Sequence, residues 1–458
     1  MSIAERFRAQ AIERGTAMAI DDGHRQLSFA QVQARADELA GLLRAHGVAR
    51  TEPIVVDVAN RATDIAAFLA AWQVGGVVVP VHLATPPAAR AALLARLGSR
   101  FVIDDGISQI ADAPPPARPL LDGAGTIIFT SGSTGQPKGV VLSAQRAADK
   151  LAMIQRMTGW QTGEASLVAL QLTFSFGQWV SWLTLLNGGC LHLRARFDAR
   201  ETLSVLDSGA VQRFSAVPTM LRHLVGLQRV SPFAGHIMAG GEPFAQTLAE
   251  RVMAAFPAAA IGDIYGLTET GTCDFFVAPA DFADQRGTIG RAGDRIDWRL
   301  DAQTQELQIR SPWAMLGYLD EPAMTGSAFD DGWFRTGDLA QALPGGGVRL
   351  IGRAKDLILR AGNKISPLEV EAAFLSHPGV AAALAAGVRQ PDEDDNEAIH
   401  LALVLAGEPD PTLDELRQWA GQRLERFKMP QVIHLVDELP SGSTGKADRK
   451  ALQALATR

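Results

Sequence analysis

Apolar positions in the N-terminal part of the chain alternate between a helical and an extended spacing. In residues 28–48, the side chains Leu39, Leu42 and Leu43 fall on one helical face, and Ser28 stands at the expected N-cap position. This pattern predicts an amphipathic helix with the three leucines on one face, ended by Gly47. The short apolar runs that follow it are bounded by Gly, Pro and Asp, which is typical of strands.

Strands and helices are predicted to alternate through the larger part of the chain. The apolar runs predict strands over 53–60, 77–81 and 100–105, with helices over 62–74 and 86–97. Comparable patterns recur through 166–195 and 211–265. Strands that alternate with helices at this spacing are typical of parallel sheets with helices on their faces.

The pattern changes after residue 285, where short strands alternate with Gly turns and predict a small β-rich subdomain. A further unit follows it, with helices predicted over Pro367–Leu375 and Thr412–Leu424 around a strand pair. The expected fold class is therefore α/β. We expect a large N-terminal domain of αβ-layered parallel sheets with the β-rich subdomain (1–353), and a small, mobile α+β C-terminal domain (354–458).

Composition and charge exclude several classes of protein. The chain has 458 residues, 47% of them hydrophobic, and a formal net charge of −7 at pH 7. This hydrophobicity argues against a disordered chain, and the acidic balance argues against a protein that binds nucleic acid through its phosphates. The only two cysteines, Cys190 and Cys273, exclude a disulfide scaffold and a cysteine-based zinc site.

No targeting segment or membrane span is expected. The N-terminal residues carry charges that interrupt any apolar run, unlike a signal peptide. The apolar stretch 65–81 is broken by Gln73, Gly75, Gly76 and Pro80, which predicts a helix, a glycine break and a strand. We therefore expect a cytoplasmic protein.

A glycine-rich segment follows the apolar strand predicted at 126–129. Residues 130–140 read Thr-Ser-Gly-Ser-Thr-Gly-Gln-Pro-Lys-Gly-Val. Glycines let the backbone approach a ligand closely, and N–H groups, hydroxyls and a lysine that converge would hold a polyphosphate. The candidate donors are Thr130, Ser131, Gly132, Ser133, Thr134, Gly135 and Lys138. A flexible Gly/Ser hairpin or linker is the alternative, and the fixed order with Pro137 before the lysine argues against it.

The segment is not a Walker A loop, which requires G-x-x-x-x-G-K-[ST]. Pro137 precedes Lys138, and Ala447 follows Lys446 in the other Gly-Lys segment. TSGSTGQPKGV instead resembles the signature loop of the adenylate-forming superfamily: acyl- and aryl-CoA synthetases, adenylation domains of nonribosomal peptide synthetases, and luciferases. Four further segments resemble that family in the correct order, so the resemblance covers nearly the whole chain.

The second segment, DIYGLTETG, implies the nucleotide contacts. By resemblance, Asp263 accepts from the adenine amino group and Tyr265 packs on adenine above a turn at Gly266. Thr268 contacts the phosphates and Glu269 holds Mg²⁺, because a carboxylate beside polyphosphate needs a hard cation between them. A solvated turn glutamate is the alternative for Glu269. The loop AGGEP resembles the adenine-flanking segment of the family, which adds Gly240, Gly241 and Glu242.

Three later segments complete the resemblance. WFRTGDLA implies that Asp338 accepts two hydrogen bonds from the ribose diol, with an ordinary turn aspartate as the alternative. GRAKDLILRAGNKISPLEVE implies that Arg353 reaches the ribose or the α-phosphate, that Lys355 is the hinge between the domains, and that Gly362 lines the thiol tunnel. LPSGSTGKADRK implies that Lys446 is the catalytic lysine.

The resemblance implies an ATP-dependent acid–thiol ligase. A carboxylic acid would attack the α-phosphate of ATP to give an acyl adenylate and pyrophosphate. The acyl group would then pass to coenzyme A or to the phosphopantetheine of a separate carrier protein. Lys446, Lys138, the loop N–H groups and Mg²⁺ on Glu269 would offset the repulsion between the anions. The family places Lys446 and Gly362 on opposite faces of the small domain, so a rotation at Lys355 is expected between the two steps.

The acid is expected to be aryl or apolar. Amino-acid-activating relatives usually carry Asp at the position of Gly177, which bears no charge here. Glycines would leave room, and apolar neighbours suit an apolar acid. The residues expected near the acyl chain are Phe174, Gly177, Gln178, Ser181, Ala239, Gly262 and Ile264, with core packing as the alternative for the aromatic side chains. A non-catalytic adenylate-binding regulator and a luciferase-like oxygenase remain alternative functions.

Overall fold

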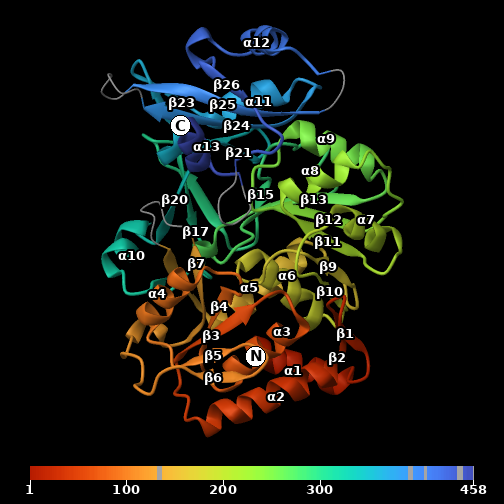
Figure 1. Cartoon of the computed structure of the whole chain (residues 1–458), viewed down its shortest axis with the longest axis vertical. Helices are drawn as coiled ribbons and strands as arrows, with labels where there is room; N and C mark the ends of the chain where they lie inside the picture. Colours follow the sequence, from red (N-terminus) through yellow and green to blue (C-terminus); the bar gives the residue numbers. More distant parts are fainter. Residues whose placement is uncertain (131–136, 390–395, 407–409, 441–446, 457–458) are drawn as a thin grey trace.

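The computed structural model describes residues 1–130, 137–389, 396–406, 410–440 and 447–456. Two large sheets and the helices around them form the lower and middle parts of the molecule, and a smaller unit lies above them (Figure 1). No helix among these residues is long and apolar enough to span a membrane.

The first large sheet has seven strands in the order β18-β8-β7-β4-β3-β5-β6. The pairs β3–β4, β3–β5 and β4–β7 are parallel, which confirms the prediction, and the pairs β5–β6, β7–β8 and β8–β18 are antiparallel. Its strands are β3 (Pro53–Val58), β4 (Val77–His82), β5 (Phe101–Ile103), β6 (Ile107–Gln109), β7 (Ala124–Thr130), β8 (Lys138–Ser143) and β18 (Gly317–Tyr318).

The second large sheet has nine strands in the order β15-β14-β13-β12-β11-β9-β10-β1-β2. Its central strands from β1 to β13 pair in parallel, and antiparallel pairs close both edges. The strands are β1 (Met18–Asp21), β2 (Gln26–Ser28), β9 (Ser166–Val168), β10 (Leu191–Leu193), β11 (Arg213–Ala216), β12 (His236–Gly240), β13 (Ala260–Tyr265), β14 (Phe275–Val277) and β15 (Arg291–Ala292).

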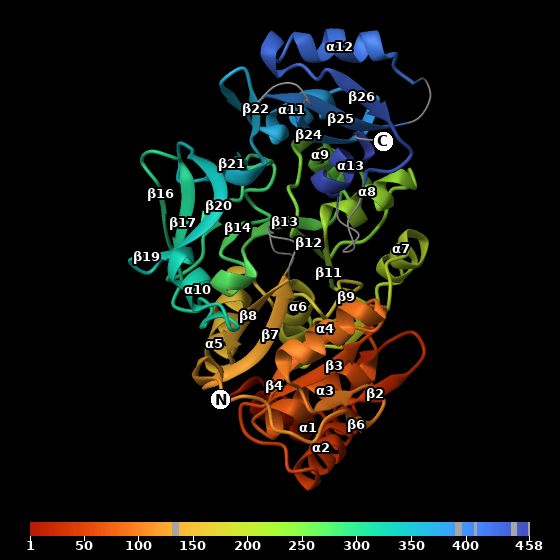
Figure 2. The same cartoon turned by 60° about the vertical axis from the view of Figure 1, so that its left-hand side comes forward.

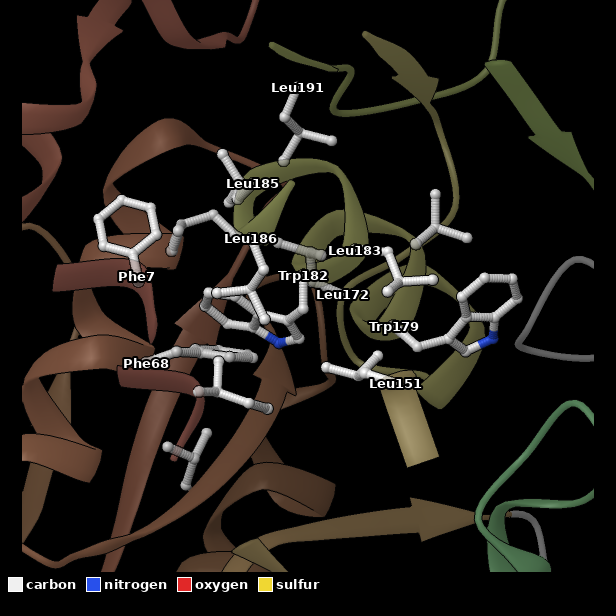
Figure 3. Packing of buried hydrophobic residues seen from close by; sticks show 14 of the residues in the cluster. Phe7, Phe68, Leu151, Leu172, Trp179, Trp182, Leu183, Leu185, Leu186 and Leu191 are labelled. Carbon is white, nitrogen blue, oxygen red and sulfur yellow. The ribbon is translucent and has the colours of Figure 1, made fainter. Parts of the chain in front are cut away.

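One hydrophobic core joins the two sheets. It includes side chains from both sheets and from the helices α1 (Ile3–Glu13), α2 (Phe29–Ala45), α3 (Ala62–Gln73), α5 (Ala144–Met157) and α6 (Ser175–Leu186). The helices α3 and α6 are buried on nearly all sides, as a helix packed between two layers must be. Figure 3 shows Trp182 of α6 against Phe68 of α3, with the ring centroids 6.2 Å apart.

The outer faces of the sheets carry the remaining helices of this part of the chain. Leu97 of α4 (Pro87–Leu97) packs on the first sheet. The second sheet is covered by α7 (Ala199–Asp207), α8 (Pro218–Gly226) and α9 (Gln246–Ala255). Neighbouring strand residues such as Val78 and Val79 belong to different cores, because successive side chains of a strand point to opposite faces.

Most of the predicted local elements are confirmed, but the helix predicted over Thr412–Leu424 ends three residues earlier, at Gly421. The Ser28 hydroxyl accepts from the backbone N–H of Gln31 and caps α2, and Leu39 and Leu43 are buried. Leu42 is 43% exposed, so the face that the three leucines share is buried only in part. Leu42 lies on the edge of the apolar stripe, and only the packing of α2 against its neighbours decides that this edge faces solvent.

The predicted β-rich subdomain is a five-stranded sheet with the path β16-β17-β20-β19, in which β21 also pairs with β20. Its strands are β16 (Asp297–Leu300), β17 (Glu306–Arg310), β19 (Phe329–Asp330), β20 (Trp333–Ala342) and β21 (Val348–Arg353), and the helix α10 (Pro322–Ala328) lies beside them. Figure 2 shows this sheet beside the edge of the second large sheet, below the C-terminal unit.

A separate core forms after the 3-10 turn η3 (Ala354–Asp356). The strands here are β22 (Ile358–Arg360), β23 (Asn363–Ile365), β24 (Val380–Arg389), β25 (Glu397–Leu405) and β26 (Val432–Leu435). The helices α11 (Pro367–Leu375) and α12 (Leu413–Gly421) pack on one face of β24 and β25, and Leu452 of α13 (Arg449–Ala456) packs on the other. Figures 1 and 2 show α13 on the side that faces the large sheets.

Candidate active site

The candidate nucleotide residues gather at the carboxyl ends of neighbouring strands. The strands β12 and β13 are parallel, and Gly240 at the end of β12 lies opposite Ile264, next to Tyr265. In open α/β sheets, ligands bind outside the carboxyl ends of the strands. The fold therefore brings the segment 240–242 beside the segment that begins at Asp263.

Asp263 is a buried carboxyl with an unused acceptor. It is 8% exposed, and its Oδ1 has no hydrogen-bond partner among the described residues. Burial raises the pKa of Asp263 well above its usual range. A buried polar atom without a partner costs free energy, so this oxygen is suited to accept a donor from a ligand.

Glu242 differs from Asp263 in that one of its carboxylate oxygens is bound by protein hydrogen-bond donors. Its Oε2 accepts from the backbone N–H of Thr219, at 3.1 Å, and from the Thr219 hydroxyl, at 2.7 Å. These donors lie in the first turn of α8, where backbone N–H groups lack helical partners. One oxygen of Glu242 is therefore bound to a helix start, which sequence reasoning did not anticipate.

Tyr265, Asp338 and Arg353 form one hydrogen-bonded chain. The Tyr265 hydroxyl donates to Asp338 Oδ2 at 2.6 Å, and Arg353 Nε donates to Asp338 Oδ1 at 2.7 Å. Asp338 and Arg353 are direct partners in the antiparallel pairing of β20 with β21. Burial, followed by the charge of Asp338, raises the pKa of Tyr265 well above its usual range, so the phenol stays a donor. The structure thus brings three of the candidate residues together.

Thr268 and Glu269 lie in the short 3-10 helix η2 (Thr268–Thr270) that follows β13. Ser175 Oγ and Thr268 Oγ1 are 3.2 Å apart, within hydrogen-bond distance. The Tyr318 hydroxyl donates to Glu269 Oε1 at 3.0 Å, and the Lys138 ammonium lies 5.2 Å from the centre of the Tyr318 ring. Tyr318 therefore connects the candidate metal carboxylate with the candidate phosphate lysine, although the sequence patterns did not single it out.

Gly266 is required by a close approach of the backbone. A Cβ atom at this position would lie 2.2 Å from the backbone nitrogen of Cys273. The chain returns tightly here, and the Asp274 N–H donates to the Tyr265 carbonyl at 2.8 Å. No side chain fits between two backbones at that distance, so the turn beneath Tyr265 needs glycine.

A buried ion pair lies behind this turn. Lys150 Nζ of α5 donates to Asp274 Oδ1 at 2.7 Å, and the side chains are 2% and 0% exposed. The Thr270 hydroxyl donates to Asp274 Oδ2, which ties η2 to the pair. The sequence signal for this pair was a lysine among the apolar positions of α5, where Ala148, Leu151 and Ile154 are buried.

The strand ends on either side of the glycine-rich segment are adjacent. Thr130 at the end of β7 pairs with Lys138 at the start of β8. Arg96 of α4 donates to the Pro137 carbonyl at 2.8 Å and to the Leu319 carbonyl at 3.1 Å. The candidates Ser131, Gly132, Ser133, Thr134 and Gly135 lie outside the described residues.

The structure changes the reasoning for two glycines expected to leave room for the acid. A Cβ at Gly177 would lie 2.5 Å from the Gln171 carbonyl oxygen, and one at Gly262 would lie 2.8 Å from the Phe276 ring. The protein itself fills the space beside both glycines, so the expectation that they open a pocket is wrong. A contact between their own backbone and the acid stays a prediction.

The other residues expected near the acid mostly bond to the protein's own backbone or are buried in its strands. The Gln178 amide donates to the Leu172 carbonyl at 2.8 Å, and the Ser181 hydroxyl donates to the Gly177 carbonyl at 2.7 Å. Ala239 and Ile264 are buried in β12 and β13, and Phe174 precedes α6 at its N-cap position.

Two of the three C-terminal candidates, Lys355 and Gly362, lie in turns that the structure describes. Lys355 lies in η3 between the two cores, and Gly362 lies in the exposed turn between β22 and β23, with φ of 76°. Lys446 lies outside the described residues, three positions before α13 begins at Arg449.

Two family profiles match the chain. The AMP-binding enzyme profile matches residues 7–121 and 104–319, and the profile of the AMP-binding enzyme C-terminal domain matches 369–446. A 2-succinylbenzoate–CoA ligase of Bacillus licheniformis is 28% identical, over 95% of this chain and 96% of that protein. A feruloyl-CoA synthase of an Amycolatopsis species is 29% identical, over 94% of each chain.

A solved structure shares the whole fold. The o-succinylbenzoate CoA synthetase of Bacillus subtilis, in complex with its acyl-adenylate intermediate, matches with a TM-score of 0.84 and 25% identity. The match covers 98% of this chain and 97% of that one. The similarity therefore includes both the large sheets and the C-terminal unit.

Proposed function

The chain belongs to the family of AMP-binding enzymes, and from this premise we propose that it is an AMP-forming acid–thiol ligase. It activates an aryl or other apolar carboxylic acid with ATP and releases pyrophosphate. It then transfers the acyl group from the adenylate to a pantetheine thiol. The observation that carries the proposal is the convergence of the Tyr265–Asp338–Arg353 chain and the Lys138–Tyr318–Glu269 contacts at the carboxyl end of β13.

The nucleotide side of the proposal is supported by two acceptors. The unused Oδ1 of Asp263 fits the amino group of adenine. The Asp338 carboxylate is held in place by Tyr265 and Arg353, and a carboxylate oxygen has lone pairs left for a ribose hydroxyl. We assign Tyr265 to the adenine face and Arg353 to the ribose or α-phosphate.

Glu269 fits a magnesium ion that arrives with ATP. Among the described residues, no group of three or more His, Cys, Asp or Glu side chains could hold a metal. Mg²⁺ is commonly bound by one or two carboxylates together with substrate phosphates, which matches a single Glu269 beside a phosphate loop. When bound, the ion neutralises phosphate charge. Lys138 and Thr268 are then placed to orient the phosphates.

The lysine that neutralises the α-phosphate is assigned to Lys446. We assign the hinge between two domains, residues 1–353 and 354–458, to Lys355. In support, the large core includes residues up to Val348, and the C-terminal core begins at Ile358. The position of α13 on the face turned toward the large sheets favours delivery of Lys446 to the nucleotide in this arrangement. Gly362 is then assigned to the thiol tunnel after rotation at Lys355.

The acid and the thiol acceptor are assigned by class. The relatives that form aryl-CoA thioesters support an aryl acid and coenzyme A, and a separate acyl carrier protein remains the second candidate acceptor. We also predict from the sequence that the protein is cytoplasmic and that it does not bind nucleic acid.

ATP–pyrophosphate exchange tests the proposal. Purified protein is screened against aryl, short-chain and medium-chain acids, with coenzyme A and with a phosphopantetheinylated carrier protein in parallel arms. We expect exchange with at least one apolar acid, and thioester formation in one acceptor arm. Absence of exchange across the panel would support the non-catalytic regulator instead, and oxygen uptake with an adenylated acid would support the oxygenase.

A further inference from the structure

Tyr318 is held rigidly beside the strand that carries Lys138. It lies on β18, where it pairs with Val140 of β8. Its backbone N–H donates to the Thr325 hydroxyl at 2.8 Å, and the next N–H, of Leu319, donates to the Gly139 carbonyl at 2.8 Å. The residue is 4% exposed. Its side chain therefore projects from a fixed backbone and not from a loose loop.

The same segment reaches Glu269 twice. The Met315 N–H donates to the Glu269 carbonyl at 2.8 Å, and the Tyr318 hydroxyl donates to Glu269 Oε1 at 3.0 Å. A carboxylate only accepts hydrogen bonds, so the phenol is the donor in this contact. The hydrogen bond occupies one carboxylate oxygen and leaves Glu269 Oε2 for another partner.

We propose that Tyr318 is a positioning residue that orients Glu269 for the metal–nucleotide complex. The inference deepens the proposed function and rests on it. An unrestrained glutamate must lose rotamer freedom when it binds a metal ion, and the fixed phenol removes part of that cost in advance. Lys138 gains from the same ring, because an ammonium over an aromatic face is attracted to it.

The chain contains an internal control, because it has only two tyrosines and both donate to a carboxylate of the site. Tyr318→Phe removes the hydroxyl next to Glu269 and keeps the ring under Lys138. Tyr265→Phe removes the hydroxyl next to Asp338, on the ribose side. Both substitutions delete one phenol oxygen and keep the ring, from the buried Tyr318 and from the half-buried Tyr265, so the two variants are chemically matched.

The test measures two affinities of the full-length protein by calorimetry, one for Mg-ATP and one for ATP in EDTA. The carboxylic acid substrate is left out of both measurements. Tyr318→Phe should weaken Mg-ATP binding by about two- to tenfold, the range for one side chain that must be ordered on binding, and leave metal-free ATP binding unchanged. Tyr265→Phe should weaken both affinities equally, because its partner Asp338 is assigned to the ribose, which both forms of ATP share. Tyr318→Leu should also weaken metal-free ATP binding, because Lys138 loses its ring.

A double variant separates positioning from packing. In a Glu269→Gln background, Tyr318→Phe should no longer change the ratio of the two affinities. The inference is overturned if Tyr318→Phe keeps the wild-type ratio, or if its effect persists without Glu269. If the wild-type protein binds neither form of ATP, the proposed function fails instead.

Discussion

Lys150→Met offers a direct test of how the candidate loop is held. The substitution leaves a side chain of similar length but removes the charge that pairs with Asp274 at 2.7 Å. Because both partners are almost fully buried, Asp274 would become an unpaired carboxylate in the interior. Removing one partner of such a pair costs about 3–5 kcal/mol. This is a large part of the typical stability of a folded domain, about 5–15 kcal/mol.

The loss should depend on pH in a defined direction. Burial raises the pKa of Asp274, and the charge of Lys150 opposes that rise. Lys150→Met removes the opposition, so the pKa of Asp274 rises further. A carboxyl with a raised folded pKa contributes stability that is fully present below its unfolded value, about 3.9, and is lost as the pH rises through the folded value. The free-energy loss caused by the substitution should therefore be smaller at pH 5 than at pH 8.

Urea-induced unfolding at the two pH values measures this effect. Lys428→Met is the matched control, because Lys428 pairs with the more exposed Glu369 and Glu425 at 2.6 Å and 2.9 Å. Exposed pairs contribute at most about 1 kcal/mol, so the control should lose little at either pH. Equal losses in the two lysine variants, or a Lys150→Met loss that does not grow with pH, would refute the reasoning.

Three further predictions concern the two half-reactions and the turn. Lys446→Ala should reduce pyrophosphate exchange by a factor on the order of 10² to 10³, the usual effect of removing one pre-positioned donor, and near-wild-type exchange would contradict the assignment. Lys355→Pro should retain exchange and lose thioester formation, because proline restricts the backbone in η3, and equal survival of both steps would argue against a rotation there. Gly266→Ala should abolish exchange, because the new Cβ would meet the Cys273 nitrogen at 2.2 Å, and retained ATP binding measured by calorimetry would show that the loop tolerates the methyl group.

The amino-acid sequence alone determined most local elements and the identity of the chemistry. Caps and apolar spacing are local signals, so α11 begins and ends at the predicted residues, Pro367 and Leu375. The motif order predicted the family, and the fold brings three of the residues that it singled out, Tyr265, Asp338 and Arg353, into contact with one another. These inferences depended on neighbours in the sequence or on a pattern repeated across a family.

Tertiary structure alone decided which distant side chains meet. Tyr318 and Glu269 are 49 positions apart, and Lys150 and Asp274 are 124 apart, so no periodicity connects them. The space beside Gly177 is likewise filled by a carbonyl that only the packed backbone locates. A sequence pattern shows that a residue is small, charged or apolar, whereas its partner depends on how sheets and helices pack, because burial makes each polar group find a partner near it in space and not along the chain.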